Sequence, residues 1–345
     1  MNIKSLVIPG TNRVVRFGRR HPVVRMPHFA LGRYLYGRNL VAPPTTCDYS
    51  PEAMPSLFNI FENDLEGNCV IAGGYHVVGV ETGNAGAIFI PTDEELDADY
   101  GVIGGYVPGD PSTDNGCDEQ TALNYWTQHG FCNGTKLCGF LSVDATNPTE
   151  VKQAMFLFEN LYFGVDLPDA WVNPFPSGNG FTWDVKGQSD PENGHCFIGT
   201  GYTPASVQID TWGMLGNLTW AAVAAYAVAR SGGALYTMLS PDQIAKAATK
   251  APNGIDWATL FADFDALGGS VAPPTPNPPQ PSPNPPAPTP PAPTPPAPPS
   301  QLVTLAQATQ WATRPLRNAS GMIRAMKAIR DVSESLSNGW PKSRL

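Results

Sequence analysis

The chain has 345 residues, 42% of them hydrophobic and 15% charged, which is enough to form a sizeable core in one large or two small domains. Its net charge of −9 is unevenly spread. Residues 1–40 carry eight Lys/Arg and no Asp/Glu, residues 41–272 six basic and 28 acidic residues, and residues 273–345 seven basic and two acidic. The acidic central part argues against nucleic-acid binding, whereas the basic ends can fold back on it or bind an anionic partner.

Four regions follow from composition. We expect a basic N-terminal arm of little periodicity at residues 1–46 and a globular domain at 47–268. A polyproline linker is expected at 269–300, because 17 of residues 273–299 are proline. A basic amphipathic helix is expected at 301–345, where apolar residues recur at helical spacing between arginines.

Within the globular domain the predicted helices precede most of the predicted strands. Helices are expected at 69–83, from Thr92 with Glu95 as a capping box, at 116–130 and at 147–160. Strands are expected at 161–167, 195–203 and 206–213, a helix at 216–230, a strand at 234–240 and a closing helix at 240–251. This order predicts an α+β fold with a helical half and a sheet half.

The sequence provides no sign of a signal peptide, a transmembrane segment, a metal site or a cofactor. The N-terminus has no apolar stretch with a cleavage site, and the chain has no run of 18 apolar residues. We therefore expect a cytoplasmic protein, with association with a virus particle as an alternative. The cysteines lack CxxC or zinc-type spacing and are expected to be free thiols: Cys47, Cys69, Cys117, Cys132, Cys138 and Cys196.

The stretch "NDLEGNC" places Cys69 where an apolar helix begins. Unpaired N–H groups and the positive end of the helix dipole favour the thiolate, which is the nucleophilic form of cysteine. Gly67 would allow a tight turn and the approach of a substrate. The amide of Asn63 could donate a hydrogen bond to a developing oxyanion.

A base and a residue to orient it follow later in the chain. His195 opens the apolar strand of "GHCFIGTGY" and could take the proton of a cysteine. Asp210 lies inside the strand of "IDTWG", where a lone carboxylate is costly unless it is paired. Pairing it with the second ring nitrogen of His195 would remove that cost and fix the histidine tautomer.

With Cys69, His195 and Asp210 in this order, residues 40–250 resemble the papain-like cysteine peptidase superfamily. That family has a Gln before Gly-x-Cys, then a His at a strand start and an Asn-Ser-Trp-Gly motif. Asn63 stands at the Gln position, Gly67 matches the Gly, and "DTWG" matches with Asp for Asn. The chain is more closely similar to uncharacterised papain-like proteins of bacteria and phages that share an Asn-Asp-x-x-Gly-Asp-Cys loop.

The resemblance implies a two-lobed papain-like fold with a central nucleophile helix and an antiparallel sheet half. It implies a cysteine peptidase or amidase that cleaves peptide or isopeptide bonds through a Cys-His-Asp triad and an acyl-thioester. Trp212 would shield the His195–Asp210 hydrogen bond, and Gly67, Asn68 and His76 would support the cleft, with a packed core histidine as the alternative for His76. Val70 and Glu66 depart from the family, which has an aromatic and a half-cystine at these positions.

Two alternatives to a peptidase remain open on the sequence alone. One is an inactive papain-like binding module, tethered by the linker to a larger assembly such as a phage particle. The other is a transglutaminase-like acyl transferase, since Asp210 replaces the family Asn. For the C-terminal helix, docking to a protein partner is favoured over a membrane surface and over nucleic acid.

The charge pattern raises two further hypotheses. The basic arm could cover an acidic cleft and hold the enzyme inactive, or it could be a strap that stabilises the domain. Asp166, Asp169 and Asp184 are candidates for an acidic cleft that favours basic side chains of the substrate.

Overall fold

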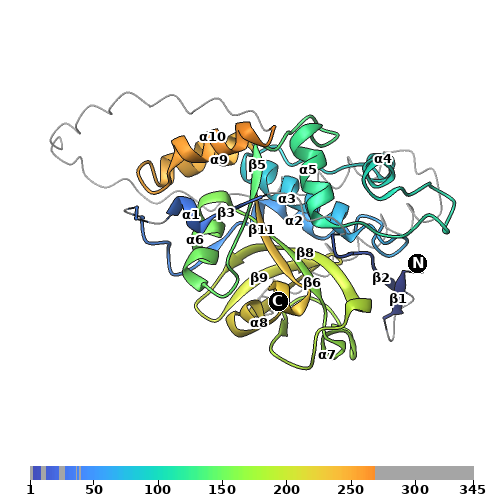
Figure 1. Ribbon diagram of the computed structural model, residues 1–345. Helices are drawn as coiled ribbons and strands as arrows, with labels where there is room; N and C mark the ends of the chain where they lie inside the picture. Colours follow the sequence, from blue (N-terminus) through green and yellow to red (C-terminus); the bar gives the residue numbers. More distant parts are fainter. Residues whose placement is uncertain (1–2, 9–12, 23–27, 36, 39, 269–345) are drawn as a thin grey trace, which may run out of the picture. The chain divides into compact units, whose positions relative to one another are not determined.

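The computed structural model describes residues 3–8, 13–22, 28–35, 37–38 and 40–268 (Figure 1). The predicted linker at 269–300 and the predicted C-terminal helix at 301–345 lie outside these residues. No helix in the described ranges is long and apolar enough to cross a membrane. All six cysteines lie in the described part of the chain and are free thiols there.

A mixed, mostly antiparallel sheet of nine strands forms the main framework. Strand β4 pairs with β8, and the other strands follow the order β3 (Phe29–Ala30), β5 (Gly139–Ser142), β11 (Ala234–Leu239), β6 (Leu161–Asp166), β8 (Gly194–Tyr202), β9 (Ser206–Thr211), β10 (Met214–Thr219) and β7 (Phe181–Trp183). β4 spans Cys47–Asp48. Every residue of β6 and of β8 is buried, so these central strands read as continuous apolar runs.

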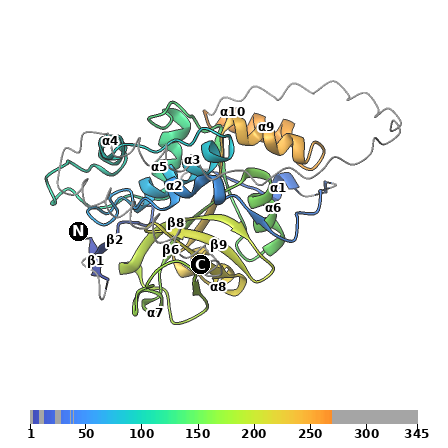
Figure 2. The same ribbon diagram turned by 180° about the vertical axis from the view of Figure 1, so that it is seen from behind.

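The helices α2 (Met54–Leu57), α3 (Cys69–Asn84), α4 (Asp93–Gly104) and α5 (Glu119–Gln128) gather on one side of β8. In Figures 1 and 2 the strands β6, β8 and β9 lie beside α7 (Asp169–Val172) and α8 (Trp220–Tyr226) on the other side. Helix α3 packs directly on β8 and is buried over nearly its whole length. The protein is therefore an α+β protein with a helical half and a sheet half, as predicted.

Capping residues fix where several predicted helices begin. Thr92 and Glu95 form the expected capping box at α4. The side chain of Asp118 caps α5, and that of Asn147 caps α6 (Pro148–Phe158). Ser240 with Gln243 forms a second capping box at α9 (Pro241–Lys250). The predictions of these helices are confirmed.

Three parts of the chain differ from the prediction. Residues 216–230, expected as a helix, start in strand β10 and become helical only at α8, because Trp212 and Gly213 adopt φ of +49° and +70° and make a two-residue hairpin turn. The N-terminal arm forms the hairpin β1 (Lys4–Val7) and β2 (Val14–Phe17) and helix α1 (Gly32–Leu35). Helix α10 (Trp257–Ala266) follows α9.

Gly74 is needed for the packing of α3 on α5. A Cβ atom at this position would lie 2.2 Å from the ring of the fully buried Trp126. We expect Gly74→Ala to lower the free energy of unfolding by about 1–3 kcal/mol, the usual cost of overpacking a core. Gly178, where an added Cβ atom would meet no other atom within 4 Å, provides the control Gly178→Ala. Urea unfolding measures both, and equal stabilities would contradict this packing.

Candidate active site

Cys69 is the first residue of α3, and its side chain is buried. The preceding residue, Asn68, occupies the N-cap position without a side-chain capping bond to the described helix. Burial raises the pKa of the Cys69 thiol to about 12, although the backbone N–H groups of Cys196 and Gly18 hydrogen-bond to the sulfur and act in the opposite direction. In this state the cysteine is therefore a neutral thiol.

His195 opens β8 and is also buried. Its Nε2 atom lies 2.8 Å from Oγ1 of Thr211, and its ring stacks on Trp212 with 3.8 Å between the ring centroids. Among the described residues, Nδ1 of His195 has no hydrogen-bond partner, so it makes no hydrogen bond with Cys69. Burial lowers the pKa of His195 to about 3, so the ring is neutral, and it is a weak base while it stays buried.

The predicted hydrogen bond between Asp210 and His195 is wrong for this structure. In the antiparallel pair β8–β9, Asp210 lies opposite Ile198, three residues beyond His195. Side chains alternate between the two faces of a strand, so Asp210 and His195 leave the sheet in opposite directions. Asp210 meets His76 of α3 and His195 meets Thr211, although both border the same small cavity. Neither carboxylate oxygen of Asp210 has a hydrogen-bond partner in the described ranges, and burial raises its pKa well above the usual value.

His76, one of the predicted supporting residues, is buried on α3 and faces Asp210. Its Nε2 atom lies 3.6 Å from Oδ2 of Asp210, and its ring packs on Phe61 with 4.4 Å between centroids. Burial lowers the pKa of His76 to about 3. This is the packed core histidine that was the alternative interpretation.

The loop before Cys69 is held by its own polar groups. Nδ2 of Asn63 donates to the backbone oxygen of Glu66 at 3.0 Å, so this amide does not point at an oxyanion in this state, unlike the prediction. Nδ2 of Asn68 donates to the backbone oxygen of Phe61 at 2.8 Å. The backbone N–H of Gly67 donates to the carboxylate of Asp114 at 3.0 Å.

Six of the eight predicted site residues line one small cavity of about 10 Å³. They are Asn63, Cys69, His76, His195, Asp210 and Trp212. The structure thus brings together residues from the loop, from α3 and from two strands that are up to 149 positions apart in the sequence. The cavity is too small for a side chain of a substrate, so the site is closed.

The N-terminal arm closes this site. Gly18 lies so near Gly67 that a Cβ atom on it would be 1.7 Å from the Gly67 oxygen. The next residue, Arg19, donates its backbone N–H to the oxygen of Gly194, the residue before His195, at 3.0 Å. The N–H of Cys117 donates to the oxygen of Gly18 at 3.0 Å. The arm therefore runs as an extended chain directly over Cys69.

Phe17 extends the cover to the other face of the histidine. Its ring packs edge-on to Trp212, with centroids 5.7 Å apart, and lies 6.3 Å from the His195 ring. Burial of the thiol and of the imidazole thus comes from the arm as well as from the core. Since burial is the largest cause of both pKa shifts, displacement of the arm would bring both groups nearer to the protonation states that a Cys–His ion pair needs.

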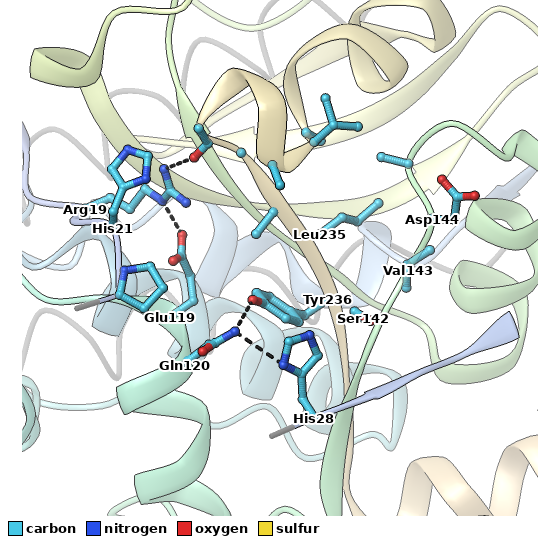
Figure 3. Close-up of a pocket in the computed structure, with 18 residues that line it drawn as sticks. Arg19, His21, His28, Glu119, Gln120, Ser142, Val143, Asp144, Leu235 and Tyr236 are labelled. Atoms are coloured by element: carbon cyan, nitrogen blue, oxygen red, sulfur yellow. Dashed lines mark hydrogen bonds and ion pairs between the residues drawn. The ribbon is translucent and has the colours of Figure 1, made fainter. Parts of the chain in front are cut away.

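The side chain of Arg19 is buried and points toward Glu119 at one end of a pocket (Figure 3). Its Nε lies 2.5 Å from Oε1 of Glu119, and its Nη1 lies 2.9 Å from Oδ1 of Asp166 and 2.6 Å from the oxygen of Gly232. Nε2 of the half-exposed His21 lies 2.8 Å from Oδ2, the other carboxylate oxygen of Asp166. Burial opposes the charge of Arg19, yet the two carboxylates outweigh it and raise the guanidinium pKa. Asp166 thus belongs to this site, whereas Asp169 and Asp184 are exposed.

One acidic cluster in the described ranges has the spacing of a metal site. The carboxylate oxygens of Glu62, Glu66 and Asp97 lie within 4.8 Å of one another. Burial and the neighbouring Asp97 raise the pKa of Glu66, which allows the cluster to share a proton instead. We assign no metal or cofactor to it.

Comparison with known proteins finds similarity of fold. No family model matches the chain, and no curated protein matches it. Solved structures with similar folds include the cysteine protease xylellain from Xylella fastidiosa, at 13% identity and a TM-score of 0.48. The match covers 66% of this chain and 98% of the xylellain chain. Digestive procathepsin L2 from the Tenebrio molitor larval midgut has 12% identity and a TM-score of 0.46 over 65% of this chain and 78% of that one.

A third similar structure is the Carica candamarcensis cysteine protease CMS1MS2 in complex with E-64, at 14% identity and a TM-score of 0.35 over 57% of this chain and 98% of that one. All three are papain-like cysteine proteases, the superfamily expected from the sequence motifs. At these identities and TM-scores the likeness assigns neither an activity nor a site residue to this chain.

The motif comparison missed Thr211, Gly18, Arg19 and Glu119. Thr211 follows Asp210 directly, and the alternation of side chains in β9 offered a choice between the two residues that only the pairing with β8 decides. The excess of basic residues in the arm indicates that the arm meets an acidic surface, but this excess does not identify which arginine is buried.

The two buried histidines predict a specific dependence of stability on pH. Their folded pKa of about 3 lies below the ordinary value, so the unfolded chain binds protons first and stability falls as pH drops below about 6.5. For each histidine the loss between pH 7 and pH 5 is about 2 kcal/mol.

His76→Leu should remove the part of the pH dependence that comes from His76. The difference in unfolding free energy between wild type and variant should therefore change by about 2 kcal/mol between pH 7 and pH 5. Phe61→Leu, which changes the packing partner of His76 without removing a titrating group, is the control. Chemical unfolding at both pH values measures the effect. A difference for His76→Leu that does not change with pH would show that the imidazole is not held neutral by burial.

Proposed function

We propose that the chain is a papain-like cysteine peptidase whose nucleophile is Cys69 and whose base is His195. The observation that carries this proposal is the position of the thiol: it lies at the start of α3 and accepts a hydrogen bond from the backbone of Cys196, the residue next to His195. Helix N-termini favour thiolate, and a neutral imidazole can accept the proton once displacement of the arm lets its pKa rise.

The reaction follows from these roles. With the arm displaced, His195 takes the thiol proton, and the Cys69 sulfur attacks the carbonyl carbon of a peptide or isopeptide bond. The backbone N–H of Cys69 stabilises the oxyanion, joined by the Asn63 amide once it leaves the Glu66 oxygen. His195 returns the proton to the leaving amine, and water, deprotonated by His195, then hydrolyses the thioester. An amine in place of water would give the transglutaminase-like transfer.

Thr211 orients His195 in this proposal, in place of Asp210. The Thr211 hydroxyl at 2.8 Å from Nε2 fixes the ring, and the stacked Trp212 keeps water from this hydrogen bond. Asp210 contributes as a buried carboxyl of raised pKa next to His76.

The arm keeps the enzyme latent. Residues 17–19 occupy the space over Cys69 that a substrate backbone needs, and their removal is the step that opens the site. This supports the inhibitory role of the arm over that of a strap alone.

A second candidate is a catalytically silent binding module. It is favoured by one observation: among the described residues no hydrogen bond joins Cys69 to His195, and the Asn63 amide donates to Glu66. Reactivity of Cys69 separates the two candidates, because a module needs none.

Gly18→Val tests both the nucleophile and the latency. Its side chain would collide with the Gly67 backbone and push the arm away without altering the globular domain. We expect Cys69 in this variant to react with iodoacetamide about tenfold faster or more than in wild type, because the thiol becomes exposed and its pKa falls.

Ser5→Val, on an exposed position of the same arm, is the matched control, and Cys69→Ala should remove the labelled site seen by peptide mass mapping. If folded Gly18→Val leaves Cys69 unlabelled, the peptidase proposal is wrong and the binding module is preferred.

Thr211→Val tests the orienting role in the Gly18→Val background. Loss of the hydroxyl should lower the rate of Cys69 alkylation at pH 7 by about tenfold, corresponding to about 1.4 kcal/mol. Asp210→Asn, which keeps the size of a side chain that makes no hydrogen bond within the described residues, should change this rate less than twofold. The opposite order of the two effects would restore Asp210 as the orienting residue.

A further inference from the structure

We infer that the pocket holding Arg19 is a binding site for an arginine side chain of the substrate, which the arm occupies in its place. The part of this inference that concerns cleavage rests on the proposed peptidase function, whereas the part that concerns binding does not. The argument starts from the charges that remain when the arm leaves.

Glu119 and Asp166 are carried by the globular domain, on α5 and β6, and their side chains are 2% and 3% exposed. Arg19 contacts both of them. If the arm moves away to open the site over Cys69, both carboxylates lose this cation. Two neighbouring carboxylates in one pocket repel each other without a cation between them, so the open enzyme favours a ligand that brings a cation back.

The geometry selects a guanidinium group over an ammonium group. Two nitrogens of Arg19 reach two carboxylates in different directions, and Nη1 also donates to the backbone oxygen of Gly232 at 2.6 Å. A planar group with several donors in a fixed arrangement satisfies all three acceptors at once, which a lysine ammonium at the end of a flexible chain does less well.

Glycines provide the space for this side chain. A Cβ atom at Gly164 would lie 1.6 Å from Oε1 of Glu119 and 2.7 Å from Nε of Arg19, and one at Gly232 would lie 2.0 Å from Oδ2 of Asp166. The pocket extends from Arg19 into a space of about 270 Å³ that includes Gln120 and Tyr236 (Figure 3). A side chain at either glycine position would therefore meet the acidic groups of the pocket.

The backbone contacts of the arm use main-chain groups alone. Arg19 donates to the oxygen of Gly194, and residues 18 and 20 exchange hydrogen bonds with the backbone of Cys117. An extended peptide with glycine before its arginine can make these bonds, because a side chain at the Gly18 position would collide with Gly67. Because Gly18 adjoins the thiol and Arg19 is the next residue, the substrate arginine lies within one or two residues of the bond that is cleaved.

Arg20 does not share this role. Its side chain is exposed and contacts backbone oxygens of Asn115 and Gly116. The inference is therefore specific for one arginine and does not require a pair of basic residues.

Chemical rescue of Arg19→Ala tests the binding part in the full chain. N-acetyl-arginine methylamide, at about ten times its Kd, should raise the Tm of this variant by about 2–4 °C, as expected for a domain of this size. N-acetyl-citrulline methylamide, which has the same shape without the charge, should give no rise. Wild type, with its pocket occupied, and the triple variant Arg19→Ala, Glu119→Gln, Asp166→Asn should not respond to either compound.

No rise in Arg19→Ala, or equal rises with both compounds, would overturn the inference. If Arg19→Ala does not fold, the same measurement is made on Gly18→Val, which leaves the pocket intact while displacing the arm.

Cleavage by Gly18→Val tests the substrate part. The substrates are fluorogenic peptides that differ in one position, which lies next to the cleaved bond or one residue further. Arginine at this position should give at least tenfold higher kcat/KM than citrulline. Adding Glu119→Gln to Gly18→Val should reduce this ratio. A Tm rise with arginine but no labelling of Cys69 would retain the pocket and reject the peptidase. Cleavage without a preference for arginine would retain the peptidase and reject the arginine pocket.

Discussion

The close approach of two backbones, at Gly18 and Gly67, is the contact on which the state of the whole site depends. A side chain at Gly18 would be incompatible with it. Through this contact the arm lies on the loop before α3, covers the thiol of Cys69 and brings Arg19 to its pocket. The same contact contributes to the burial that raises the thiol pKa and lowers the imidazole pKa, so the arm and the core together keep the cavity closed.

The arrangement of charges follows from the same geometry. An arm without acidic residues meets a domain with an excess of carboxylates, but most of this charge is exposed and contributes little to stability. One buried exception is the group of Arg19, Glu119 and Asp166, where two carboxylates require a cation. In our proposal, a single buried arginine therefore connects the closed state of the site with the kind of substrate that would replace the arm.

Much of the fold and part of the site could be predicted from local signals. Capping residues such as Thr92 and Asn147 and the apolar runs of β6 and β8 mark their elements, because these patterns depend only on neighbours in the sequence. The helix start at Cys69 and the strand start at His195 belong to this class. The strand β10 was not predicted, since its start depends on a turn in which Trp212 adopts positive φ, a conformation uncommon for non-glycine residues.

The sequence by itself determined the elements that carry the thiol and the imidazole, and an arm and a domain of opposite charge. Tertiary structure decided the rest. The pairing of β9 with β8 placed Thr211 beside His195 and turned Asp210 to the opposite face, because one position along a strand reverses the direction of a side chain. The path of the arm buried Arg19 and left Arg20 exposed. Both outcomes depend on contacts between residues far apart in the chain, which no local pattern encodes.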